Sequence, residues 1–160
     1  MQAIAEDTVV DADTVALESL TRVLVRIAWD SAHAAPPGVT FPQMRLLLMA
    51  DGLGRVPSSA LATALGVNAS SVTRLADRLA AAGYLVRGED PHKRSVVTLE
   101  VTDRGRRVVA KVMHRRHAAL HAVLTQVPQA HRSAVVAAAR TLVSAAAAVP
   151  EVGSAGPGPL

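Results

Sequence analysis

The spacing of apolar residues changes in one short region of this chain, and that change constrains the fold more than any other feature. Over most of the 160 residues, apolar side chains recur every three to four positions, which is the period of an amphipathic helix. In residues 96–101, by contrast, Val97, Leu99 and Val101 occupy alternate positions, which is the period of a strand. We therefore predict a mainly helical chain with one small β-hairpin, an α+β fold.

Helix-breaking and helix-capping residues divide the helical pattern into separate segments. Residues 35–38 contain two prolines and a glycine, and Gly66 and Gly83 are typical of helix ends. Asn68 and Thr102 are favourable N-caps. The expected helices cover residues 12–33, 40–51, 58–65, 69–82, 103–127 and 129–149, and the expected strands cover residues 55–56, 84–87 and 96–101.

Composition excludes several classes of protein. The length fits one domain, and the absence of cysteine excludes disulfides, thiol nucleophiles and cysteine-based zinc sites. Residues 1–18 carry five carboxylates and no Lys or Arg, unlike a secretory signal. The longest apolar runs are far shorter than the ~20 residues of a membrane span. We expect a soluble, cytoplasmic protein.

The basic residues are concentrated in one part of the chain. Residues 74–116 contain eleven Lys or Arg against five carboxylates, which leaves six basic and eight acidic residues elsewhere. Such clustering is typical of a surface that binds a polyanion, although a solvated helix face can have the same composition. Charge alone therefore does not separate the two interpretations.

Residues 58–83 predict two helices joined by a short turn that contains glycine, which is the helix-turn-helix arrangement. In this arrangement the second helix enters the major groove of DNA, and its N-terminal side chains reach the base edges. Arg74 can bind guanine in a bidentate manner or pair with a phosphate. An ordinary N-cap followed by a solvent-exposed face would have similar residues. The candidate DNA-binding residues of this helix are Asn68, Ser70, Ser71, Thr73, Arg74 and Arg78.

The polar segment 88–95 is the predicted turn of the hairpin, and its tip is basic. A basic turn beside a recognition helix can reach an adjacent minor groove. His92, Lys93 and Arg94 are the candidates, and Arg94 is the leading one. Asp90 could instead pair with Arg94 and stiffen the hairpin, which would leave Lys93 to reach the DNA.

Residues 56–106 resemble the multiple antibiotic resistance regulator (MarR) family of winged helix-turn-helix transcription regulators. The resemblance depends on an ordered series of short motifs with matching spacing. Lys93 stands where the family often has Asp, and Ser95 where it often has a second Arg, so the tip is more basic than usual. The series is Leu61-Ala62, Leu65-Gly66-Val67, Ser71-Val72-Thr73-Arg74-Leu75, Leu79, Gly83-Tyr84-Leu85, Asp90-Pro91, Arg94, and Thr102 with Gly105.

The resemblance implies a bacterial homodimer that docks two recognition helices, residues 69–82, on a pseudo-palindromic operator in double-stranded DNA, most often as a repressor. The apolar faces of the first and last predicted helices are wider than a small monomer can bury, which agrees with a partner surface. The implied regions are 12–51 for dimerisation and the hinge, 55–105 for the winged helix-turn-helix, 103–149 for dimerisation, and a disordered tail at 151–160.

Members of the MarR family commonly release DNA when a small, often aromatic, molecule binds between the dimerisation helices and the DNA-binding lobe. The candidate residues for such an effector pocket are Trp29, His33, Phe41, Met44 and Arg45. The alternative, which we favour, is that Trp29 and Phe41 belong to the core and that Met44 fills a gap. The sequence identifies no ligand.

Three further interpretations compete with this one. His114, His117 and His121 can share a helix face, as in a metal-responsive regulator, but zinc needs three or four convergent ligands and basic residues surround these histidines. No metal or other cofactor is therefore expected. A winged-helix module that binds only proteins would not need the basic residues of the recognition helix and hairpin. An enzyme would need a nucleophile with a base, a carboxylate pair or a glycine-rich phosphate loop, and we find none in the sequence.

Overall fold

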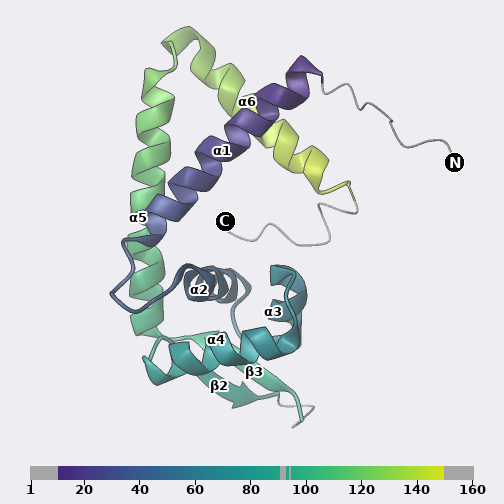
Figure 1. Cartoon of the computed structure of the whole chain (residues 1–160), viewed down its shortest axis with the longest axis vertical. Coiled ribbons are helices and arrows are strands. Elements are labelled where there is room, and N and C mark those ends of the chain that lie inside the picture. The colour runs from purple at the N-terminus through teal and green to yellow at the C-terminus, as the bar shows by residue number, and fades with distance from the viewer. Residues whose placement is uncertain (1–10, 91–92, 94, 150–160) are drawn as a thin grey trace, which may run out of the picture.

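The computed structural model describes residues 11–90, 93 and 95–149. Most of these residues are helical, and a small sheet lies near the middle of the chain (Figure 1). The elements are α1 (Ala12–Ala32), α2 (Phe41–Leu53), β1 (Val56–Pro57), α3 (Ser58–Leu65), α4 (Ala69–Ala81), β2 (Leu85–Glu89), β3 (Val97–Val101), α5 (Asp103–Gln126) and α6 (Gln129–Ala146).

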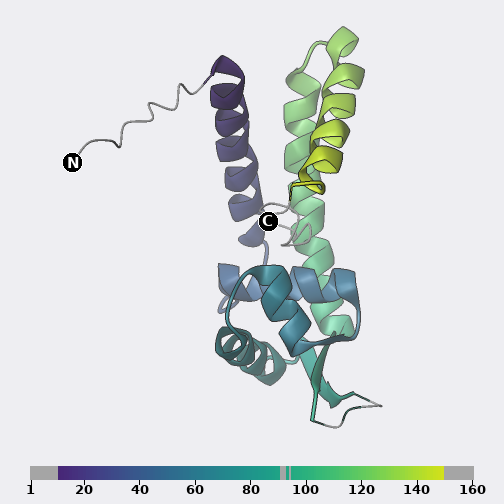
Figure 2. The same cartoon turned by 90° about the vertical axis from the view of Figure 1, so that its right-hand side faces the viewer.

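The helices and strands form two parts, which we call the lobe and the arm. The lobe contains α2, α3, α4, the sheet and the part of α5 up to Val112, and it lies at the lower end of Figure 1. The arm contains α1, the rest of α5 and α6, and it lies at the upper end. Helices α1 and α6 cross in projection in Figure 1, but Figure 2 shows them on opposite sides of a gap. The long helix α5 therefore connects the two parts.

The lobe has a continuous apolar core that includes all three strands. Leu46, Leu47 and Leu61 are completely buried, and Leu79 and Leu99 are 1% exposed. Burying one such side chain contributes about 1.5–3 kcal/mol relative to leaving it in water. The lobe is consequently held together by its own side chains.

The sheet is antiparallel and has the strand order β1-β3-β2. Leu99 pairs with Val56 on one side and with Arg87 on the other, and Thr98 pairs with Pro57 and Gly88. Because successive side chains of a strand alternate between faces, Leu99 points into the core while Thr98 lies on the opposite face. The alternation predicted for residues 96–101 is therefore present.

The predicted fold class, mainly helical with a small β wing, is confirmed. The strands of the hairpin each begin one residue later than predicted, and the larger difference is that β2 continues through Gly88 and Glu89, which the sequence analysis assigned to the turn. Gly88 and Glu89 pair with Thr98 and Val97, so the backbone pairing extends the strands further than side-chain periodicity indicates. The predicted tail at 151–160 lies outside the described residues. No helix within the described residues is long and apolar enough to cross a membrane.

Candidate nucleic-acid interface

Gly66 and Asn68 form the turn between α3 and α4 and fix where α4 begins. Gly66 ends α3 with a left-handed backbone, φ +64°, which a side chain would strain. Asn68 then caps α4, and its side-chain oxygen accepts a hydrogen bond of 2.8 Å from the backbone N–H of Ser71. This cap leaves the remaining N–H groups of the first turn directed toward the solvent, where an anion can bind.

The two faces of α4 differ sharply in composition. Val72, Ala76 and Leu79 are at most 1% exposed and fix the helix against the lobe. The hydroxyl of Thr73 donates to the carbonyl of Ala69, and that of Ser70 donates to the side chain of Asn68. Both hydroxyls retain lone pairs that can accept a further hydrogen bond. Of the residues of this helix that the sequence predicts to contact DNA, Ser71 is half-buried. The others are exposed, namely Asn68, Ser70, Thr73, Arg74 and Arg78.

Arg74 and Arg78 are one helical turn apart and both project from α4. Within the described part of the chain, neither guanidinium forms an ion pair. The two arginines line a shallow hollow of about 360 Å³ whose other walls are Pro42, Val67, Ser71 and Leu75. Their charges are consequently available to an anionic partner.

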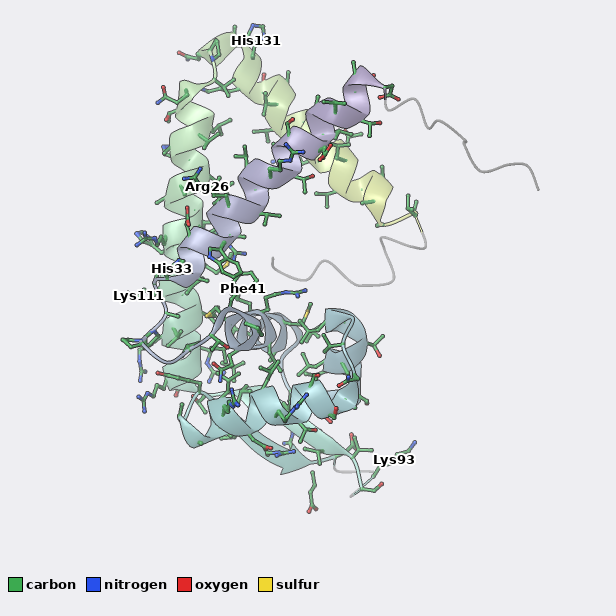
Figure 3. All side chains as sticks on the ribbon, in the orientation of Figure 1. Arg26, His33, Phe41, Lys93, Lys111 and His131 are labelled. Atoms are coloured by element: carbon green, nitrogen blue, oxygen red, sulfur yellow. The ribbon has the colours of Figure 1, made fainter. Side chains whose placement is uncertain are left out.

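The hairpin tip is ordered at its base by hydrogen bonds within the turn. The Asp90 N–H donates to the carbonyl of Val96, and the Lys93 N–H donates to the Asp90 carboxylate at 3.0 Å. Lys93 is exposed and lies at the far end of the sheet (Figure 3). His92 and Arg94, for which the sequence predicts contact with DNA or, for Arg94, pairing with Asp90, lie outside the described residues.

The basic cluster of residues 74–116 is divided among several environments. Arg87 of β2 forms an ion pair with Asp77 of α4, which ties the hairpin to the recognition helix. Arg104 lies over the ring of Tyr84, 5.0 Å from its centroid. The hydrogen bond from Arg106 and its positive charge hold the pKa of the Asp103 carboxyl below its usual value. Arg87, Arg104 and Arg106 therefore have structural partners that the count of charges did not reveal.

Arg116 is a buried arginine at the contact between α5 and α1. Its residue is 9% exposed, and its Nε donates to the hydroxyl of Ser31 at 3.2 Å. Burial lowers the pKa of this guanidinium from its ordinary value, because the charged form loses hydration. The count of basic residues could not distinguish Arg116 from the exposed ones, since its burial depends on α1, whose Ser31 lies 85 positions earlier in the chain.

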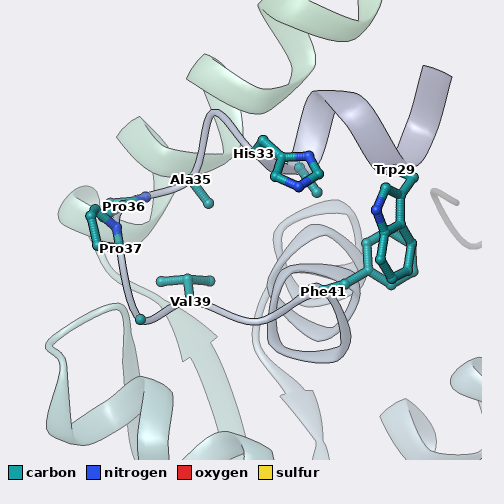
Figure 4. Close-up of a pocket in the computed structure, with 9 residues that line it drawn as sticks. Trp29, His33, Ala35, Pro36, Pro37, Val39 and Phe41 are labelled. Atoms are coloured by element: carbon teal, nitrogen blue, oxygen red, sulfur yellow. The ribbon is translucent and has the colours of Figure 1, made fainter. Parts of the chain in front are cut away.

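A cavity of about 340 Å³ lies where α1 turns into α2 (Figure 4). Trp29, His33 and Phe41 line it, together with the loop at residues 35–39. The rings of Trp29 and Phe41 are 4.4 Å apart between centroids and tilted by 35°. Trp29 is 51% exposed, so it does not belong to the core of this chain, because only the last turns of α1 pack against α5.

The other two candidate effector residues lie apart from this cavity. Met44 is 1% exposed and packs in the core of the lobe. Arg45 is half-buried, and its Nε is buried without a hydrogen-bond partner among the described residues. The structure therefore brings Trp29, His33 and Phe41 together and leaves Met44 and Arg45 out of the cavity lining.

The histidines of α5 lie on its exposed surface. His114, His117 and His121 are all exposed. Within residues 11–90, 93 and 95–149, no group of three or more His, Asp or Glu side chains is arranged to hold a metal ion.

Comparison with known proteins identifies the family. Residues 38–95 match the model of the MarR family, and this match covers α2, the helix-turn-helix and β2 but ends before β3. The crystal structure of Rv1404 from Mycobacterium tuberculosis is 33% identical, with a TM-score of 0.75, and the match covers 90% of this chain and 98% of that one. The chain belongs to the MarR family. MarR proteins are transcription regulators and not enzymes.

Two further relatives extend the comparison. The uncharacterized HTH-type transcriptional regulator YfiV of Bacillus subtilis is 25% identical over 97 residues, which cover 61% of this chain and 61% of that protein. The structure of CouR from Rhodococcus jostii RHA1 bound to p-coumaroyl-CoA is 23% identical, with a TM-score of 0.63 over 84% of this chain and 91% of that one. At this identity, CouR supports the MarR fold only.

Proposed function

We propose that this MarR protein represses transcription by binding a pseudo-palindromic operator in double-stranded DNA as a homodimer. The observation that carries the proposal is the exposed face of α4, where Asn68, Ser70 and Thr73 stand beside Arg74 and Arg78, which form no ion pair among the described residues. A helix with this face fits the major groove. The hairpin that carries Lys93 lies beside α4, so it can reach the adjacent minor groove. A protein that binds chromosomal DNA in a bacterium acts in the cytoplasm.

The arm supports the homodimer. None of the 18 residues of α6, all of which the structure describes, is buried. Monomeric proteins rarely expose a continuous apolar surface of this extent, so a second copy of the chain is the expected cover. A twofold dimer would place its two half-sites about 34 Å apart on DNA. The exposed large apolar residues are Val15, Leu17, Leu20, Val23, Leu24, Val25 and Trp29 of α1 and Val135, Leu142 and Val143 of α6.

The aromatic cavity supports release by a small organic effector. Trp29 and Phe41 present two rings in contact beside the turn from the arm into the lobe, so a ligand there could alter how the two parts are oriented. CouR was crystallised with p-coumaroyl-CoA, an aromatic acyl thioester. Trp29 is the single tryptophan of the chain, so its fluorescence reports directly on binding at this cavity.

The proposed function is tested by titrating purified protein with the DNA upstream of its own gene and with a scrambled duplex at two salt concentrations. We expect tight binding to the specific duplex with two chains per site. The logarithm of the affinity should fall with the logarithm of salt by about 0.9 for each phosphate contacted. Equal binding to both duplexes, or binding to neither, would contradict a sequence-specific regulator.

Arg74→Ala separates base contact from phosphate contact. Loss of a base contact should weaken binding to the specific duplex by about 1–3 kcal/mol and leave the scrambled duplex unaffected, whereas loss of a phosphate contact should weaken both. Arg26→Ala is the matched control, because Arg26 is a highly exposed arginine on α1, outside the lobe (Figure 3).

A further inference from the structure

The side chain of Arg55 crosses the small sheet just before β1 begins. Its Nε donates to the hydroxyl of Thr98 on β3 at 3.2 Å, and its Nη2 donates to the backbone carbonyl of Glu89 on β2 at 2.8 Å. The strand order is β1-β3-β2, and Arg55 directly precedes β1. Its guanidinium therefore reaches from the β1 edge of the sheet, across β3, to β2 at the opposite edge. The three strands are thus joined by a side chain in addition to their backbone hydrogen bonds.

The space for this contact exists because residue 88 is glycine. A Cβ built on Gly88 would lie 2.8 Å from Nη2 of Arg55 and 3.2 Å from Oγ1 of Thr98, so any side chain there would displace the guanidinium. Gly88 and Thr98 are directly paired across β2 and β3. Thr98 is only 4% exposed although it lies on the face of the sheet away from the core. Arg55 therefore covers this face at the position where the hairpin leaves the lobe.

The contact acts at the base of the hairpin tip. Glu89 is the last residue of β2, and Asp90 follows it with the turn that carries Lys93. A hydrogen bond to the Glu89 carbonyl consequently limits how far the tip can swing away from the sheet. The ion pair between Arg87 and Asp77 holds the same strand to α4, so the hairpin is fixed from two directions.

We propose that Arg55, accommodated by Gly88, is a positioning residue that holds the hairpin at a set angle to the recognition helix. This inference rests on the proposed DNA-binding function, but it assigns to Arg55 no contact with DNA. Its contribution is to order the tip before binding, which lowers the entropy lost when the tip is immobilised on DNA.

The first test uses the free protein and does not depend on DNA. The peptide bond after Lys93 is a trypsin site at the hairpin tip, and its initial cleavage rate, mapped by mass spectrometry, measures how often the tip opens. We expect Arg55→Gln to raise this rate about tenfold, the scale of one hydrogen bond from a charged donor. Arg55→Lys should behave like Arg55→Gln, because an ammonium does not present the two N–H groups in the same geometry.

Two controls make this test specific. Arg107→Gln removes an exposed arginine of α5 in the lobe and should leave cleavage at Lys93 unchanged. Gly88→Ala should raise cleavage as Arg55→Gln does, and the double variant Arg55→Gln/Gly88→Ala should show no further increase, since both changes remove the same contact. Additive effects, or cleavage unchanged in Arg55→Gln, would overturn the proposed contact.

The second test measures DNA binding by the same variants. We expect Arg55→Gln to lower the affinity for the specific duplex about tenfold while the salt dependence stays as in the wild type. The slope of the logarithm of affinity against the logarithm of salt could instead become shallower by about 0.9, while the cleavage rate of the free protein stays unchanged. This result would identify a direct phosphate contact by Arg55 and overturn the positioning role. Increased cleavage with unchanged affinity would also overturn it. Failure of the wild-type protein to bind DNA would contradict the proposed function, while the cleavage test would still decide whether Arg55 orders the tip.

Discussion

In the lobe, apolar side chains are buried within the chain itself, whereas in the arm most of them face outward. Leu46, Leu47 and Leu61 of the lobe are completely buried. Leu20 of α1 is 45% exposed and Val143 of α6 is 68% exposed, although both lie on helices of regular geometry. The comparison indicates that the lobe is stabilised by its own core, whereas the arm leaves apolar surface that the proposed second copy of the chain would cover.

The largest expected effect concerns the arm. Leu20→Asp and Val143→Asp should each weaken the homodimer by about 3–5 kcal/mol, because a carboxylate would be buried without a partner in the interface. Sedimentation equilibrium measures the change. Val86→Asp is the control, since Val86 is 49% exposed on the hairpin and should leave dimerisation unchanged. Dimers that persist in both arm variants would show that these faces are not the interface.

The next effect concerns the lobe. Leu47→Ala should lower the free energy of unfolding by about 2–5 kcal/mol, because it removes completely buried methyl groups and leaves a cavity. Leu53→Ala, on the same helix α2 but 51% exposed, should cost less than about 1 kcal/mol. Urea unfolding measured at several protein concentrations separates this effect from dimer dissociation. Equal losses in the two variants would contradict an independent core in the lobe.

A smaller effect is expected within the arm, where α1 contacts α5. Ser31→Ala removes the hydroxyl that accepts from the buried Arg116, and we expect a loss of about 1–3 kcal/mol in unfolding free energy. Ser19→Ala is the control, because Ser19 is exposed on the same helix and bonds only to the carbonyl of Val15 among the described residues. If Ser31→Ala unfolds like Ser19→Ala, the contact between Ser31 and Arg116 does not stabilise the packing of α1 against α5.

The smallest effect concerns the start of the recognition helix. Asn68→Ala should lower the unfolding free energy by about 1 kcal/mol through loss of the N-cap. Asn68→Asp should keep the cap and the stability, but its carboxylate would repel phosphates and weaken DNA binding. Thermal unfolding and a DNA titration on the same samples separate the two roles. Normal DNA binding by Asn68→Asp would place the start of α4 away from the backbone of the duplex.

Most of the local structure follows from short-range sequence signals. Asn68 and Thr102 cap α4 and α5 as predicted, and Gly66 ends α3. These features depend on residues three or four positions apart, so the sequence contains the whole interaction. The same reason explains why the exposed face of α4 was predicted, since the apolar spacing of Val72, Ala76 and Leu79 defines the opposite face.

Long-range partners were not predictable from the sequence. Arg55 lies 43 positions before Thr98, and Arg116 lies 85 positions after Ser31. The sequence around a basic residue does not indicate whether that residue faces DNA, stacks on an aromatic ring or is buried beside a hydroxyl. A glycine within a strand can suggest a close contact, but the sequence analysis assigned Gly88 to the turn, so this signal for the position of Arg55 was missed.

The sequence by itself determined the helices, the hairpin and the polar face of α4, because periodicity and capping act between near neighbours. Only the tertiary structure decided that Trp29 is exposed beside Phe41, that Arg116 is buried, and that Arg55 crosses the sheet. The burial and the partners of a side chain depend on which distant segments pack around it, and packing of this kind is a property of the folded chain as a whole.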